Sequence, residues 1–299
     1  MRSWLLKVKK KADRLAVLWT ARFVLLLAKL MPYRFGVWTG GVLGGIGYFV
    51  LRRERKRAIE HLSAVFPDRG DDWVRQTARA SFVHLGKSLL ELILITPDRL
   101  SRIARVEGKE SIERAVALGR GTVWFTGHIG NWELSGAVIA LTKPVSVVAA
   151  PLEPEPLNDL IVNLRNRVGM TVILRGRPGA SRELIRVFKE NRMLGLLIDQ
   201  DTDVEGAFVD FMGRPAWTPT AAASMAFKFG APVLFGFAHR DSDGRHTITV
   251  EGPIELIRTG DEQKDIVANT ALFTKKIEET IMKNPEQWVW MHRRWRRQP

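Results

Sequence analysis

The sequence contains no cysteine, only two tyrosines and no long hydrophobic run free of charge. The absence of cysteine excludes disulfides, a catalytic thiol and thiolate metal sites, and it fits a reducing compartment. No Gly-x-Ser-x-Gly segment is present either, so the chain offers no familiar nucleophile for an acyl-enzyme. The longest uncharged apolar run covers residues 35–51, which is close to the short limit of about 17 residues for a membrane-spanning helix.

Acidic residues are scarce relative to basic ones. The chain has 46 lysines and arginines against 32 acidic residues, a formal net charge of +14, which indicates an anionic partner. Basic residues cluster in residues 1–14, 52–57 and 292–299, and ten tryptophans suit either a membrane interface or nucleic-acid bases. A basic membrane- or nucleic-acid-binding module is therefore one alternative. The clusters flank apolar segments and do not form a nucleic-acid motif, which favours a membrane surface and no nucleic acid.

The first 51 residues are the most apolar part of the chain, although Arg22, Lys29 and Arg34 interrupt them. We interpret residues 1–51 as a membrane anchor, either a marginal span or a helical hairpin lying in one leaflet. Basic clusters on both sides favour attachment at the cytoplasmic face over a full crossing. The alternative is an ordinary buried helix pair with close glycine contacts.

Residues 52–299 are predicted to form one α/β domain. A helix is expected over residues 72–95, and beyond residue 122 short apolar strands alternate with amphipathic helices, a pattern typical of a mostly parallel central sheet flanked by helices. Residues 205–214 are expected to be a loop whose phenylalanines line an acyl tunnel or belong to the core. Surface positions are expected for His61, His84 and His246. The predicted strands cover residues 122–127, 145–150, 170–174, 193–199, 232–239 and 246–252.

The segment "WFTGHIGNWE" ends a buried strand at a histidine between glycines. In α/β folds, catalytic groups gather at the sheet edge where strands end and the following helices begin. Gly130 permits a sharp turn, and the amides near Gly130 and Asn131, at the start of the next helix, could bind an oxyanion. Glu133 is expected to bond the ring of His128 and make it a base toward an alcohol. The alternative is a structural histidine that satisfies local amides.

Several charged residues after this segment are candidates for substrate binding. Arginine forks bind phosphate in a bidentate way, so Arg165, Arg167 and Arg175 are candidate anion ligands. Asp199 follows another strand and is expected at the same sheet edge. The two aspartates at alternate positions after it lack the rest of an EF-hand, so no metal site is predicted.

Three segments together resemble the late acyltransferases of bacterial lipid A biosynthesis, within the glycerolipid acyltransferase superfamily marked by His-x4-Asp/Glu. These segments are "HIGNWE", "RAIEHLSAVFPD" and "PEQWVWMHRRWRRQP", and the resemblance runs through roughly residues 20–299. It implies that His128 is the base and Glu133 its partner, with Asn131, Arg165 or Arg167, and Asp199 in or near the site.

The resemblance also implies the reaction. An acyl-carrier-protein thioester would donate a fatty acyl chain to a hydroxyl of a phosphorylated glucosamine disaccharide lipid, at the cytoplasmic face of the inner membrane. No metal or organic cofactor is implied. Similar enzymes acylate mannosylated phosphoinositides with acyl-coenzyme A as donor, which is the runner-up reading.

Overall fold

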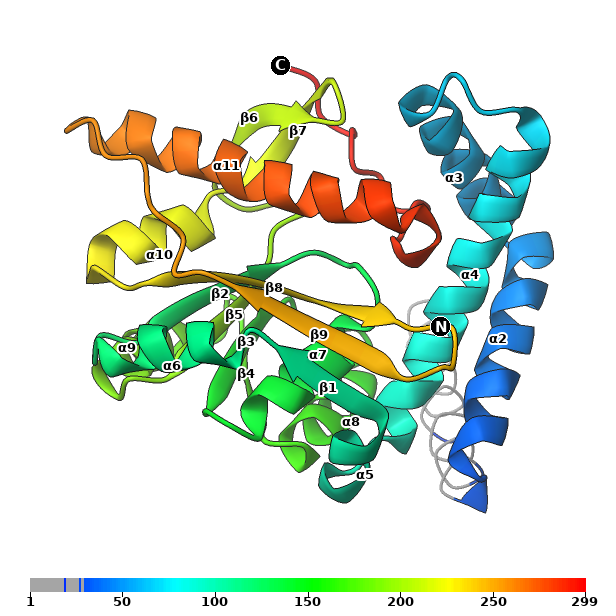
Figure 1. Cartoon of the computed structure of the whole chain (residues 1–299), viewed down its shortest axis with the longest axis horizontal. Coiled ribbons are helices and arrows are strands. Elements are labelled where there is room, and N and C mark those ends of the chain that lie inside the picture. The colour runs from blue at the N-terminus through cyan, green and yellow to red at the C-terminus, as the bar shows by residue number, and fades with distance from the viewer. Residues whose placement is uncertain (1–18, 20–26, 28–29) are drawn as a thin grey trace, which may run out of the picture.

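The computed structural model describes residue 19, residue 27 and residues 30–299 (Figure 1). Its helices are α2 (Tyr33–Val50), α3 (Arg52–Val65), α4 (Asp71–Leu94), α5 (Pro97–Ile103), α6 (Lys109–Ala117), α7 (Trp132–Ala140), α8 (Glu155–Arg167), α9 (Ala180–Lys189), α10 (Ala221–Phe229), α11 (Glu262–Lys283) and the 3-10 turn η1 (Pro285–Gln287). Its strands are β1 (Ala104–Glu107), β2 (Thr122–Thr126), β3 (Val145–Ala149), β4 (Met170–Leu174), β5 (Met193–Leu197), β6 (Gly206–Phe211), β7 (Arg214–Pro219), β8 (Val233–Arg240) and β9 (His246–Glu251).

Seven strands form one sheet in the order β1-β9-β8-β2-β5-β3-β4, and every neighbouring pair is parallel except β8 and β9. This confirms the predicted mostly parallel sheet, and all six predicted strands are present. The expectation of a loop over residues 205–214 is wrong, because β6 and β7 pair there as an antiparallel hairpin. Its register sets Phe208 opposite Trp217, a cross-strand aromatic pair of the kind that stabilises a hairpin.

Strand β2 lies in the middle of the sheet and is buried along its whole length. Its side chains alternate between two apolar cores. Phe125 stacks on Phe235 of β8 and on Phe273 of α11, with ring centroids 5.0 and 4.4 Å apart. Trp124 belongs to the other core, with Leu134 of α7. Because side chains of a strand alternate between its two faces, β2 is packed between helices on both sides. In Figure 1, α11 lies above the sheet and α7 below it.

Helix α2 packs along α4 through backbone contacts at glycines, side by side in Figure 1. A Cβ at Gly40 would lie 2.5 Å from the carbonyl oxygen of Gly86, and one at Gly44 would lie 2.2 Å from that of Phe82. Among the described residues, no helix is both long and apolar enough to cross a membrane. Residues 33–50 therefore do not form the predicted marginal span. The close glycine contacts expected of the alternative helix pair are present there, although one face of α2 is exposed and the pair is not buried. The hairpin lying in one leaflet stays a prediction. The rest of that segment, apart from residues 19, 27, 30–32 and 51, lies outside the described residues.

The face of α2 that points away from α4 remains apolar. Exposed large apolar side chains on it, more than half exposed, are Phe35, Trp38, Leu43, Ile46, Phe49 and Val50. An exposed apolar helix face of this size marks an interaction surface.

Candidate active site

The histidine of the glycine turn pairs with an aspartate that follows the neighbouring strand. Thr126 of β2 lies in parallel register with Leu197 of β5, so the residues two positions further on, His128 and Asp199, face each other. The ring Nδ1 of His128 lies 2.7 Å from Asp199 Oδ1, and its backbone amide donates to Oδ2 at 2.7 Å. Asp199 is buried, whereas the His128 side chain is 22% exposed.

Glu133 occupies a different position from the one predicted. Its carboxylate accepts two hydrogen bonds from Arg165, from Nε at 2.9 Å and from NH2 at 2.6 Å. The prediction that Glu133 bonds to the His128 ring is therefore wrong, and Asp199 is the carboxylate that bonds to this ring. The physical reason is that α7 begins at Trp132, so Glu133 lies in its first turn and faces α8, where a planar guanidinium matches both carboxylate oxygens.

The backbone of the turn is largely committed to internal hydrogen bonds. The Gly130 amide donates to the carbonyl of Gln287 at 2.8 Å, so its predicted role in binding an oxyanion is wrong. Gly130 has φ +57°, and a Cβ there would lie 1.5 Å from the Ala238 carbonyl oxygen, so only glycine fits. Asn131 is fully buried, and its side chain caps α7 by accepting from the Leu134 amide at 3.0 Å.

Asn131 also joins a buried polar cluster centred on Glu91 of α4. Glu91 accepts hydrogen bonds from Asn131 Nδ2, the Tyr33 hydroxyl and both terminal nitrogens of Arg240 at 2.6–2.7 Å, and from His246 Nε2 at 3.1 Å. Burial alone would raise the pKa of Glu91, but these donors lower it below its ordinary value. The expectation that His246 and His84 are exposed is wrong, since they are 0% and 8% exposed.

The predicted arginines separate into two groups. Arg165 and Arg175 line a pocket of about 450 Å³ that also contains His128 and Glu133. Arg167 points elsewhere, because its NH2 donates to the carbonyls of Ile93 and Ile95 at 2.8 and 3.0 Å and so ties α8 to the end of α4.

The pocket is apolar on most of its surface. Gln200 and Thr202 are polar lining residues in addition to those named above. Its apolar walls come from β2, β3, β4, β5 and α7, with Gly136 and Gly195 leaving room where a side chain would stand. These wall residues include Trp124, Val147, Val148, Leu152, Met170, Leu196 and Ile198. A cavity of this shape suits an alkyl chain with a reactive end group beside the imidazole.

Asp199 is held ionised beside the histidine. Burial would raise its pKa, but the charge on His128 and hydrogen bonds from His128 and from Trp288 lower it to about 2. With Nδ1 engaged by this carboxylate, and no described residue hydrogen-bonded to Nε2, the imidazole is a competent base toward a hydroxyl in the pocket. Among the described residues, no group of three or more histidine or acidic side chains is placed to hold a metal ion.

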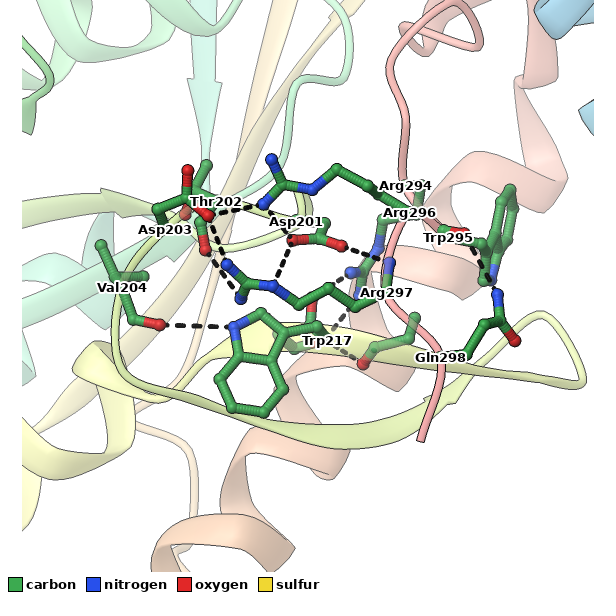
Figure 2. Close-up of polar contacts among 12 residues, drawn as sticks. Asp201, Thr202, Asp203, Val204, Trp217, Arg294, Trp295, Arg296, Arg297 and Gln298 are labelled. Carbon is green, nitrogen blue, oxygen red and sulfur yellow. Dashed lines mark hydrogen bonds and ion pairs between the residues drawn. The ribbon is translucent and has the colours of Figure 1, made fainter.

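The C-terminal segment holds the loop after Asp199 in place (Figure 2). Arg296 donates to Asp201 at 3.1 Å and to Asp203 at 2.7 Å, and the Arg297 amide donates to Asp201 at 2.9 Å. The buried Arg294 reaches the hairpin, where its NH1 donates to the Trp217 carbonyl at 2.5 Å. The two aspartates after Asp199 therefore bind arginines. Sequence reasoning found no role for Trp288 or for these arginine pairs, because both depend on the packing of the chain's end.

Taken together, the structure places a His–Asp pair at the carboxyl edge of a parallel sheet, beside an apolar pocket, an arrangement that can take a proton from a hydroxyl. Residues 6–297 match the family of bacterial lipid A biosynthesis acyltransferases, and the chain belongs to that family. It is an O-acyltransferase.

Relatives of two kinds align with the chain, and the lipid A acyltransferases do so over nearly all of it. The lipid A biosynthesis palmitoleoyltransferase of Escherichia coli is 26% identical over 289 residues, which cover 94% of this chain and 91% of that protein. The lauroyltransferase of the same organism is 26% identical over 286 residues, covering 94% and 92%. A phosphatidylinositol mannoside acyltransferase of Mycobacterium tuberculosis is 27% identical over 195 residues, covering 64% and 59%.

Proposed function

We propose that this enzyme, at the cytoplasmic face of the inner membrane, moves a fatty acyl chain from an acyl-carrier-protein thioester to a hydroxyl of a phosphorylated lipid A precursor. The observation that carries the proposal is the Nε2 edge of His128, to which no described residue is hydrogen-bonded, in an apolar pocket and backed by buried Asp199. The net charge of +14 suits both an acidic carrier protein and an anionic lipid. No metal or organic cofactor takes part in this scheme.

In the proposed reaction, His128 Nε2 takes the proton of the acceptor hydroxyl as its oxygen attacks the thioester carbonyl. The new C–O bond forms and the C–S bond breaks, and the imidazolium returns its proton to the departing thiolate. The products are an ester and a free carrier thiol. Asp199 stabilises the imidazolium, and Glu133 acts through Arg165, which it holds at the pocket wall. Arg175, exposed at the pocket and without a carboxylate partner among the described residues, is the cation available for a substrate phosphate.

The proposed anchoring region, residues 1–51, contributes an interfacial surface to residues 52–299, the transferase domain. The exposed apolar face of α2 would lie at the headgroup boundary, with the basic cluster of residues 52–57 beside it. The rival idea of a nucleic-acid-binding tail loses support. Of its arginines, Arg294, Arg296 and Arg297 are bonded to the protein, and Trp288 is buried.

The test replaces His128 by Gln, which keeps the size of the side chain without its basicity, and by Ala. Acyl transfer to membrane lipid is measured with an acyl-carrier-protein donor and with acyl-coenzyme A. Both variants should lose on the order of a hundredfold or more in rate, with an unchanged midpoint of thermal unfolding. A rate near wild type in either folded variant rejects the base role.

The same assay decides between the two enzyme readings. Turnover with acyl-coenzyme A on a mannosylated phosphoinositide, and none on a lipid A precursor, would establish the alternative acceptor and donor. Mass spectrometry of lipid A from cells with and without the chain then gives the length of the transferred acyl group.

A further inference from the structure

A second cleft lies behind the turn that carries His128. Its volume is about 480 Å³, and it shares no lining residue with the pocket that contains His128. One stripe of α4 forms its base, including Arg79, His84 and Lys87, and Arg240 and Glu286 come from the opposite wall. The cleft is therefore a separate site.

This cleft, which we name the α4 cleft, has more positive than negative charge. Arg79, Lys87 and Arg240 face it, and Glu286 is its one acidic lining residue. Arg240 is already paired with buried Glu91, whereas Arg79 and Lys87 form no ion pair with any carboxylate in the described part of the chain. Among the residues that the structure describes, these two cations have no counter-ion.

The environment of these cations favours the binding of an anion. Burial lowers the pKa of Lys87, and the nearby charge of Arg240 lowers it further, against the opposing effect of Glu91. The side chain of Arg240 is 8% exposed, and its Nε has no hydrogen-bond acceptor among the described residues. A bound anion would offset the repulsion between Lys87 and Arg240.

The position of the α4 cleft identifies the kind of anion. One of its cations, Arg79, borders the exposed apolar face of α2 at Phe49. The guanidinium of Arg79 lies 5.7 Å from the centre of the Phe49 ring, and the stem of Lys87 packs against Gly41. An apolar helix face with an arginine at its edge and a lysine close behind it matches the boundary between lipid chains and phosphate headgroups. Arginine and lysine are the side chains that bind phosphate best.

We propose that the α4 cleft binds the phosphate group of an anionic membrane lipid, at a site distinct from the transfer pocket. This inference goes beyond the proposed reaction and does not depend on His128. The lipid bound in the α4 cleft would hold the enzyme on the bilayer. The acceptor would react in the separate pocket that contains His128.

The experiment measures binding of the full chain to phosphatidylcholine vesicles with and without phosphatidic acid. Lys87→Gln and Arg79→Gln should each weaken binding to phosphatidic acid vesicles by about tenfold, the size of one charge-assisted contact. Glu286→Gln removes the opposing charge and should strengthen binding severalfold. The matched control is Arg182→Gln, which loses the same charge at an exposed position on α9 and should change binding little.

Two outcomes overturn the proposal. One is an equal loss in Arg182→Gln and Lys87→Gln, which would show nonspecific attraction to the bilayer. The other is tight binding of inorganic phosphate that Lys87→Gln abolishes without affecting vesicle binding, which would show a soluble anion as the ligand. Thermal unfolding checks that each variant is folded. Repeating the vesicle assay in His128→Gln separates the two proposals, since binding should be unchanged even if that variant transfers acyl groups normally.

Discussion

The indole Nε1 of Trp288 donates to Asp199 Oδ2 at 2.8 Å, the same oxygen that accepts the backbone amide of His128. Oδ1 is thereby left for the imidazole ring. Trp288 itself is fixed by a bridge between its backbone and that of Ile129, which brings the chain's end against the glycine turn. The buried carboxylate is thus held from three directions, and each donor stabilises its charged form.

Trp288→Phe tests whether this indole tunes the catalytic pair. Losing one donor should raise the pKa of Asp199, so its carboxylate holds the proton of the imidazolium more tightly. The neutral base is then present only at higher pH, and the acid limb of the kcat/KM profile should move upward by about half to one pH unit. The control is Trp290→Phe, because Trp290 Nε1 donates to the Pro285 carbonyl instead. A shift of equal size in both variants would mean that the effect is general loosening of the C-terminal segment.

The roles of the two acids are separated by Asp199→Asn and Glu133→Gln. Asp199 touches the imidazole, so its amide variant should favour the wrong tautomer and lower kcat on the order of a thousandfold. Glu133 touches Arg165, and its amide variant should lower kcat/KM by about tenfold through a less fixed guanidinium. The rates of acyl transfer by the two variants show which loss is larger, and the midpoints of thermal unfolding check that both are folded. The reverse order would restore Glu133 as the partner of His128.

Gly195 of β5 sets a limit on the room for an acyl chain. It lines the pocket, and a Cβ there would lie 3.1 Å from Val147 Cγ1 and 3.3 Å from Trp124 Cε3. Gly195→Val should therefore fill part of the apolar cavity and shift the preferred donor to a shorter chain, with a smaller shift for Gly195→Ala. Competition between donors of different length, read by mass spectrometry of the product, checks this. Unchanged preference with reduced rate would place the chain elsewhere.

The sequence predicted the sheet and the position of His128 but not its partner. Strand periodicity is a local signal, so β2 and the turn after it could be predicted from the sequence. The partner depends on strand order, because only the pairing of β2 with β5 brings residue 199 beside residue 128. Glu133 was the nearest acid in sequence, yet α7 begins at Trp132 and turns its first carboxylate toward α8. Trp288 gave no local signal, since its contact with Asp199 joins distant segments.

The apolar N-terminal region shows a different limit. The sequence of a glycine-rich apolar helix is compatible with a membrane segment and with a helix that packs on another helix. The partner surface on α4 decides between them, because Gly86 lets the backbone of α2 approach closely. The alternation of glycines could suggest contact, but not which glycine makes it.

Two adjacent glycines of α2 test this packing. A Cβ at Gly44 would lie 2.2 Å from the Phe82 carbonyl oxygen, whereas one at Gly45 meets only Val83 Cγ2 at 3.8 Å. Gly44→Ala should push α2 from α4 and lower the free energy of unfolding by about 1–3 kcal/mol. Gly45→Ala should leave it unchanged or raise it by up to about 1 kcal/mol, because alanine favours the helix. Urea unfolding in detergent compares them, and equal effects would contradict the close approach.

Buried His84 makes stability depend on pH. Burial, and then the charge of Arg240, lower its pKa from 6.5 to about 3. Between these values the unfolded chain binds a proton that the folded chain does not, so stability is complete above about pH 6.5 and falls as the pH drops. From pH 7 to 5 this one histidine should cost about 2 kcal/mol.

His84→Gln isolates this contribution. Its loss of packing lowers stability at every pH, so the readout is the difference between unfolding free energies at pH 7 and pH 5. That difference should be smaller than in the wild type by about 2 kcal/mol, since glutamine takes up no proton in either state. An unaltered difference in His84→Gln would mean that the folded protein accepts a proton at this position, and that Arg240 and burial do not keep the imidazole neutral.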